Sequence, residues 1–105
     1  MSYAVVLTQA AEQDLEQLFD FVLERELARD DGNLALAEEA LVAIRAGLQT
    51  LERSPFTCRK AGTSPFVREL VIPFGHTGYV ALFEIMDGST VVIAALRHQR
   101  EEDYH

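Results

Sequence analysis

The 105-residue chain contains one cysteine, no tryptophan and six glycines that occur singly. The lone Cys58 excludes an intramolecular disulfide and a metal site built from several cysteines, and it is compatible with a reducing cytoplasm. Scattered glycines cannot form a phosphate-binding glycine-rich loop. No apolar run approaches the ~20 residues of a membrane helix, and no signal segment opens the chain. With the length, these features predict one cytoplasmic domain, residues 1–105, without a membrane segment.

Residues that bind metals or act as nucleophiles are also few. His76, His98 and His105 lie far apart, and no two of them have the spacing of a helical metal site. We therefore expect no metal and no cofactor. Cys58 stands beside two cationic residues, which favour a thiolate, but no histidine lies near it in the sequence. An ordinary loop cysteine is therefore the simpler interpretation.

Positive charge is scarce, because nine lysines and arginines face seventeen acids for a net charge of −8. This balance argues against a broad nucleic-acid-binding surface. The acids are concentrated in residues 9–31, where eight acids and two arginines give a net −6. Residues 54–76 hold three cations and one acid, a net +2. The later half of the chain can therefore still present a local positive site.

The first half has the pattern of a strand followed by two helices. Residues 3–7 are mostly β-branched or apolar and predict a strand. Thr8 offers a hydroxyl cap to a helix whose apolar residues recur at positions 15, 18, 19, 22 and 23. A turn signal over 30–33 separates it from a second helix, from about Leu34 to Arg53. Such a short connection predicts an antiparallel helical hairpin.

The second half has the pattern of three strands, over residues 67–72, 79–86 and 90–96, with tight-turn residues at 87–88. The element order is β-α-α-β-β-β. We therefore predict an α+β fold in which an antiparallel sheet carries the α-helical hairpin packed on one face.

Several side chains of the second half suit phosphate chemistry, and they are Arg59, Lys60, Arg68, Arg97, His98, Arg100 and Tyr104. If the strands pair in sequence order, these groups can converge on one edge of the sheet. Cations and a proton-transfer group without a metal suit phosphodiester cleavage by 2′-OH attack. The alternative is that Arg68 pairs with an acid and residues 97–100 form a solvated strand exit.

Three stretches resemble toxins of the ParE/RelE superfamily of bacterial type II toxin–antitoxin modules. They are "VVLTQAAEQDLEQLFDFV", "SPFTCRKAG" followed by "VRELVIPFGHTGYVALFEI", and "VVIAALRHQRE". The resemblance implies the same α+β fold and one of two functions. ParE-like members poison DNA gyrase. RelE-like members are ribosome-dependent mRNA endonucleases that need no metal.

A RelE-like activity would place the catalytic residues at Arg68 and His98. The residues that would support them are Arg59, Lys60, Arg97 and Tyr104. Two features favour the ParE-like branch. The charge of −8 differs from the strongly basic character of toxins that enter the ribosome, and the long helical hairpin resembles the ParE-like members. Acids at 101–103 also weaken any attraction of the strand exit for phosphate.

The resemblance also implies a cognate antitoxin, with a DNA-binding domain and a segment that folds on binding. We expect a toxin–antitoxin hetero-oligomer in which this segment occupies the surface between the sheet and the helical hairpin. The candidates for exposed apolar anchors are Phe74, Tyr79, Phe83 and Val92. Arg97 and Arg100 are candidates for polar contacts. The alternative for the four apolar residues is core packing.

Overall fold

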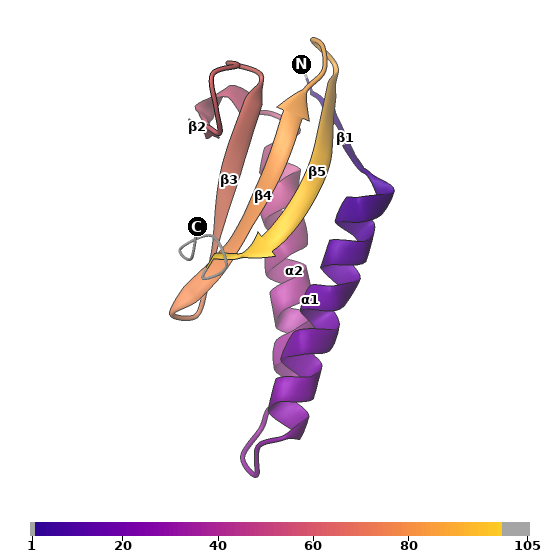
Figure 1. Ribbon diagram of the computed structural model, residues 1–105, viewed down its shortest axis with the longest axis vertical. Helices are drawn as coiled ribbons and strands as arrows, with labels where there is room; N and C mark the ends of the chain where they lie inside the picture. The colour runs from indigo at the N-terminus through magenta and orange to yellow at the C-terminus, as the bar shows by residue number, and fades with distance from the viewer. Residues whose placement is uncertain (1, 100–105) are drawn as a thin grey trace.

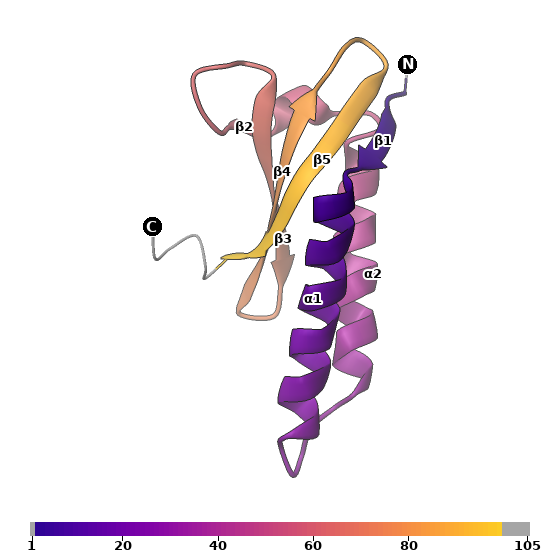
Figure 2. The same cartoon turned by 45° about the vertical axis from the view of Figure 1, so that its right-hand side comes forward.

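The computed structural model describes residues 2–99 of the chain. A five-stranded sheet with the order β1-β5-β4-β3-β2 carries two helices on one face (Figures 1 and 2). The strands are β1 (Ala4–Leu7), β2 (Arg59–Lys60), β3 (Val67–Phe74), β4 (Thr77–Ile85) and β5 (Thr90–His98). The helices are α1 (Gln9–Leu27), α2 (Ala35–Thr50) and the short 3₁₀-helix η1 (Pro55–Thr57).

The expected α+β class and the helical hairpin on one face are confirmed, with one difference in the sheet. β1 pairs with β5 in parallel, so the sheet is mixed instead of wholly antiparallel. The other three pairings are antiparallel. The two-residue strand β2 was not expected, because so short a segment carries no recognisable alternation of its own.

β3 runs further than the sequence predicts. A strand end was expected before Pro73, but β3 continues to Phe74 and a two-residue turn leads into β4. Hydrogen-bonded and non-hydrogen-bonded pairs alternate along an antiparallel ladder. The Ile85 N–H donates to the Phe66 oxygen, so these two residues form a hydrogen-bonded pair. When the alternation is followed along β3 from that pair, Pro73 and Gly78 form a non-hydrogen-bonded pair, which requires no N–H from proline. The sheet therefore accommodates Pro73.

Specific contacts fix both ends of α1. The Thr8 hydroxyl accepts a hydrogen bond from the Ala11 N–H over 3.1 Å, so Thr8 is the N-cap, as expected. At the other end, the backbone N–H of Asn33 donates to the carboxylate of Glu26 over 3.0 Å. A Cβ atom at Gly32 would collide with the backbone oxygen of Glu26, so this turn requires glycine.

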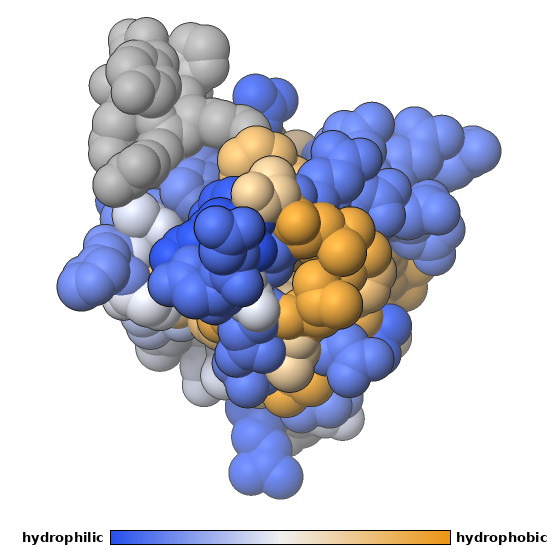
Figure 3. Space-filling model, turned by 90° about the horizontal axis from the view of Figure 1, so that it is seen from below, coloured by the Kyte–Doolittle hydropathy of each residue, from blue (hydrophilic) through white to orange (hydrophobic). Residues whose placement is uncertain are grey.

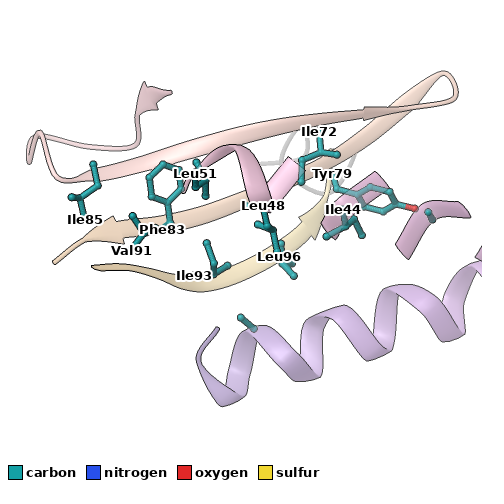
Figure 4. Close-up of a cluster of buried hydrophobic side chains, with 13 residues drawn as sticks. Ile44, Leu48, Leu51, Ile72, Tyr79, Phe83, Ile85, Val91, Ile93 and Leu96 are labelled. Carbon is teal, nitrogen blue, oxygen red and sulfur yellow. The ribbon is translucent and has the colours of Figure 1, made fainter. Parts of the chain in front are cut away.

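The core lies between the helices and the sheet (Figure 4). α2 contributes Ile44 and Leu48, and Leu51 follows at its C-cap, while Phe83 of β4 and Ile93 of β5 face them from the sheet. All five side chains are buried. This apolar contact holds the hairpin against the sheet and fixes how far the hairpin extends past it.

The hairpin projects beyond the strands at its loop end (Figure 1). α1 has 19 residues and is therefore about 28 Å long, whereas β1 has four residues. The outer half of α1 consequently overhangs the end of the sheet where β5 and the β3–β4 turn lie. This overhang forms one wall of the groove described below.

Candidate functional site

Arg68 lies on β3, half-buried, and its guanidinium is held by backbone oxygens. Its Nη1 atom donates to the carbonyls of Phe56 over 3.0 Å and of Cys58 over 2.7 Å, and its Nε donates to the carbonyl of Pro65 over 2.8 Å. The guanidinium carbon also lies 5.2 Å from the centre of the Phe56 ring. Arg68 thus fastens the loops on either side of β2, and it pairs with no acid among residues 2–99.

Arg59 and Lys60 form β2 and are both exposed. Arg59 lies opposite Glu69 in the ladder, and its Nε donates to the Glu69 carboxylate over 3.0 Å. Lys60 lies opposite Arg68. The sequence-predicted cations Arg59, Lys60 and Arg68 are therefore brought together, at the β2 end of the sheet.

His98 is the last residue of β5, and Arg97 precedes it on the exposed side of the strand. The Nε2 atom of His98 lies 3.2 Å from the hydroxyl of Thr77 on β4, within hydrogen-bonding distance. Arg97 and His98 both border the groove between the sheet and α1. The predicted roles of Arg100 and Tyr104 fall outside the described residues.

Arg68 and His98 are not close to each other. Along β4, Arg68 lies opposite Phe83 and His98 lies opposite Tyr79. Those positions are four residues apart, which is about 13 Å along a strand, and two strand spacings of ~4.8 Å separate β3 from β5. The two backbones are thus about 16 Å apart, and the Arg68 guanidinium is held at the loops beside β2, so the two side chains do not converge on one phosphodiester group.

The four candidate anchors differ in exposure. Phe74 is half-buried and Val92 is half-buried, whereas Tyr79 and Phe83 are 3% and 1% exposed. For Tyr79 and Phe83 the alternative of core packing therefore holds, because both point from β4 into the core (Figure 4). Tyr79 packs between the rings of Phe74 and His98, at centroid distances of 6.0 and 5.6 Å. Burial raises the pKa of the Tyr79 phenol.

A groove of about 970 Å³ opens between the overhanging part of α1 and the end of the sheet. Its apolar lining comprises Leu18, Phe21, Leu36, Phe74, Tyr79 and Leu96, and its polar lining comprises Asp14, Gln17, Arg25, Arg29, His76, Thr77, Arg97 and His98, beside Gly75. Three arginines accompany one acid. The lining therefore carries more cations than acids although the chain carries a net −8, and Arg25 and Arg29 are in addition paired with acids outside the lining. From the hairpin end, a hydrophobic area is visible beside hydrophilic residues (Figure 3).

A buried acid orients Arg25 of α1 and Arg29 of the turn that follows the helix. Glu26 is 3% exposed, and its Oε2 atom lies 3.2 Å from Nε of Arg25 and 3.7 Å from Nη1 of Arg29. The Asn33 N–H, followed by the two arginines, holds the pKa of this carboxyl below its ordinary value. Glu26 therefore stays ionised and keeps both guanidinium groups beside the groove.

The floor of the groove depends on how α1 meets β5. β1 covers β5 only as far as Ile93. Beyond that point the carboxylate of Asp14 on α1 accepts a hydrogen bond from the backbone N–H of Leu96 over 3.0 Å. A helix side chain thus takes the place of a strand partner and holds α1 close to the outer edge of β5.

Sequence reasoning missed Arg25 and Arg29 as site residues. They were counted within an acidic segment, where the net charge conceals them. One signal could have revealed Arg25, because Phe21 and Arg25 are four residues apart on α1 and so share a helix face, while Arg29 follows in the turn after the helix. Phe21 also falls outside the apolar stripe and is 57% exposed.

Neither a metal centre nor a reactive thiol is evident in the described part of the chain. Among residues 2–99, no three His, Cys, Asp or Glu side chains are placed to hold a metal ion. Burial raises the pKa of the Cys58 thiol, against a smaller opposing effect of Arg68. No helix within these residues has the length and apolar character needed to cross a membrane.

A family model described as "ParE toxin of type II toxin-antitoxin system, parDE" matches residues 5–103. The chain belongs to this family. It is similar to Toxin RelE1 of Caulobacter vibrioides, with 29% identity over 102 residues that cover 97% of this chain and 99% of that protein. The protein is therefore a ParE-like toxin of a type II toxin–antitoxin module, and its partner is a cognate antitoxin.

The fold of this ParE-family toxin also matches a solved structure, the "Chromosomal ParDE TA system from P. aeruginosa". The TM-score is 0.68 at 17% identity, over 92% of this chain and 96% of that chain. At this identity the likeness shows the fold alone. One relative is named RelE and the other ParDE, which are the names of the two branches of the superfamily. The names therefore do not decide which target this toxin acts on.

Proposed function

We propose that this toxin acts on DNA gyrase in the cytoplasm and that its antitoxin neutralises it in a hetero-oligomer. The separation of Arg68 from His98 is the observation that favours the ParE-like branch over the RelE-like branch. A RelE-like site needs proton-transfer and cationic groups around one phosphate. Here the guanidinium of Arg68 is engaged by three backbone carbonyls, at the end of β3 that is remote from His98.

A supercoiling assay tests the gyrase target. Purified toxin is added to gyrase, ATP and relaxed plasmid, and supercoiled and cleaved DNA are measured. We expect loss of supercoiling or accumulation of cleaved DNA, and prior addition of the antitoxin should prevent either effect. Unchanged supercoiling at a large molar excess of toxin would contradict the proposal.

The alternative is a RelE-like ribosome-dependent mRNA endonuclease. The name of the relative Toxin RelE1 favours it, as does the position of Arg97 and His98 together at the rim of the groove. This activity predicts cleavage of mRNA in the A site of programmed ribosomes. Intact mRNA in that assay, together with inhibited gyrase, would remove the alternative.

The groove is the surface we assign to the antitoxin. Its apolar floor includes Phe74 and part of Tyr79, and its rim includes Arg97. An antitoxin segment that folds on binding would place apolar side chains on the floor and carboxylates against the arginines. The groove is large enough for side chains of a helix or an extended segment, since ligand pockets of 300–1,000 Å³ are common.

A further inference from the structure

A second surface, at the opposite end of β3, has a different character from the groove. Phe56 and Phe66 are 46% and 49% exposed, and their rings meet edge to face with centroids 6.2 Å apart. Single exposed apolar residues are ordinary on protein surfaces, but two rings in contact form a continuous patch. We call Phe56, Phe66 and the neighbouring Arg59 and Lys60 the aromatic patch.

The segment that carries the aromatic patch is rich in cations. Residues 53–68 contain four cations and no acid, in a chain whose net charge is −8. Glu69 on β3 balances Arg59 through their ion pair. Lys60 is exposed beside it. An aromatic centre with a charged rim is the usual composition of a protein–protein hot spot.

The patch is preorganised by its backbone contacts. The Phe56 carbonyl accepts a hydrogen bond from Arg68, and the Phe66 N–H donates to the Ser64 hydroxyl over 3.2 Å. The Phe66 carbonyl accepts from the Ile85 N–H over 2.8 Å. Because both residues are held by neighbouring structure, a partner that covers the rings loses little free energy to ordering them.

The patch and the groove are far apart. Phe66 immediately precedes β3, and Phe74 of the groove ends it, so the eight residues of β3 separate them by about 26 Å. Figure 1 shows β2 at one end of the sheet and the β3–β4 turn at the other. One short peptide segment lying in the groove would therefore leave the aromatic patch uncovered.

We propose that the aromatic patch is the surface through which the toxin contacts its protein target, at an apolar cleft bordered by carboxylates. This inference rests on the proposed function, in that it assumes a protein target. DNA is the less suitable occupant, because phosphate binding needs several cations and Arg68 and Arg59 already have partners. Two exposed rings beside the exposed Lys60 suit an apolar cleft with carboxylates at its border. The toxin would then use separate surfaces for target and antitoxin.

The experiment combines growth inhibition with antitoxin affinity. The double variant Phe56→Ala with Phe66→Ala should lower toxicity on induction in bacterial cells, and it should need at least about tenfold more toxin for half-inhibition of gyrase. Its affinity for the antitoxin should stay within about twofold of wild type. Lys60→Glu should weaken inhibition about threefold, and added salt should reduce that difference.

A matched control removes two exposed apolar residues elsewhere. Leu27 and Leu34 are 61% and 50% exposed and do not line the groove. Leu27→Ala with Leu34→Ala should keep full toxicity. If the phenylalanine variant folds poorly, Phe56→Ser and Phe66→Ser are made singly, and only variants with the wild-type melting transition are compared.

The outcomes separate the inference from the proposed function. A well-folded patch variant that is as toxic as wild type overturns the inference, whatever the target. A wild-type toxin that stops growth without inhibiting gyrase overturns the proposed target, and the patch variants then still test the surface. Binding of the wild-type toxin to plasmid DNA alone, lost in the patch variants, would overturn the assignment to a protein partner.

Discussion

The two ends of β3 use arginine in different ways. At the β2 end, Arg68 donates to the carbonyls of three residues in two loops, and its charge is enclosed by the structure. At the opposite end, Arg25 and Arg29 share the carboxylate of Glu26 and border an open groove with Arg97. The first arrangement encloses a guanidinium group among backbone carbonyls, and the second leaves guanidinium groups beside an open groove.

This difference explains why net charge alone is a poor guide to the function of the chain. The lining of the groove holds three arginines and one acid, although Glu26 of α1 pairs with Arg25 and Arg29 from beneath and Asp31 pairs with Arg29. The other acids of that helix are mostly exposed. An acidic protein can therefore still expose guanidinium groups, Arg97 among them, along one groove.

The largest expected effect is on stability, at Arg68. Arg68→Ala removes three hydrogen bonds from a charged donor and leaves the carbonyls of Phe56, Cys58 and Pro65 without it. We expect a loss of about 2–3 kcal/mol in the free energy of unfolding, measured by urea denaturation. Arg97→Ala, at an exposed position, should change it by less than about 0.5 kcal/mol. Similar losses of unfolding free energy in both variants would contradict the conclusion that Arg68 stabilises the fold and Arg97 does not.

The next effect is on antitoxin affinity. Arg97→Glu places a carboxylate at the rim of the groove and should weaken antitoxin binding about tenfold, or 1.4 kcal/mol. Lys60→Glu makes the same change of net charge at the other end of the sheet, and it should change the affinity by less than about twofold. Titration calorimetry at moderate salt measures both. Equal weakening of antitoxin binding by both variants would show that the net charge of the toxin, and not contact at the groove, governs the affinity.

Much of the fold could be predicted because its signals are local. The Thr8 cap, the apolar stripe of the first helix and the strand near residues 90–96 each depend on neighbouring residues. The parallel pairing of β1 with β5 could not be predicted. It joins residues about 86 positions apart, and no local pattern encodes the relative direction of two strands. The strand over Pro73 was missed for the same reason, because its tolerance depends on the ladder.

The site was less predictable than the fold. The sequence identified the cations of residues 59–68 as candidate site residues. It did not indicate that the partners of Arg68 are backbone carbonyls. The groove joins α1 to the end of β5, which no local pattern relates. The sequence left open whether Tyr79 is exposed or packed in the core, because an aromatic residue near a turn is compatible with both. Burial is a tertiary property, so only the packing of β4 against α2 decides it.

A smaller effect concerns pH, through Glu26. Its folded-state pKa is lowered, so its contribution to stability is present above the pKa of the unfolded chain and is lost as pH falls through the folded-state pKa. Glu26→Gln should therefore lower the melting temperature at pH 7, and the difference should narrow toward pH 3. The pKa of Asp87 is also lowered, by Ser89, so some acid sensitivity should remain in the variant. A constant difference across this pH range would show that Glu26 acts through packing alone.

The smallest expected effect separates the two branches of the superfamily. Gln at position 98 can still hydrogen-bond the Thr77 hydroxyl, but it loses the edge contact with the Tyr79 ring and cannot transfer protons near neutral pH. His98→Gln should therefore cost about 1 kcal/mol or less in stability, and growth inhibition should be unchanged at equal toxin levels. A RelE-like enzyme that used His98 for proton transfer would lose about 10²-fold or more in cleavage rate. Loss of toxicity in a well-folded His98→Gln variant, with gyrase unaffected by the wild type, would therefore favour catalysis at the groove over binding.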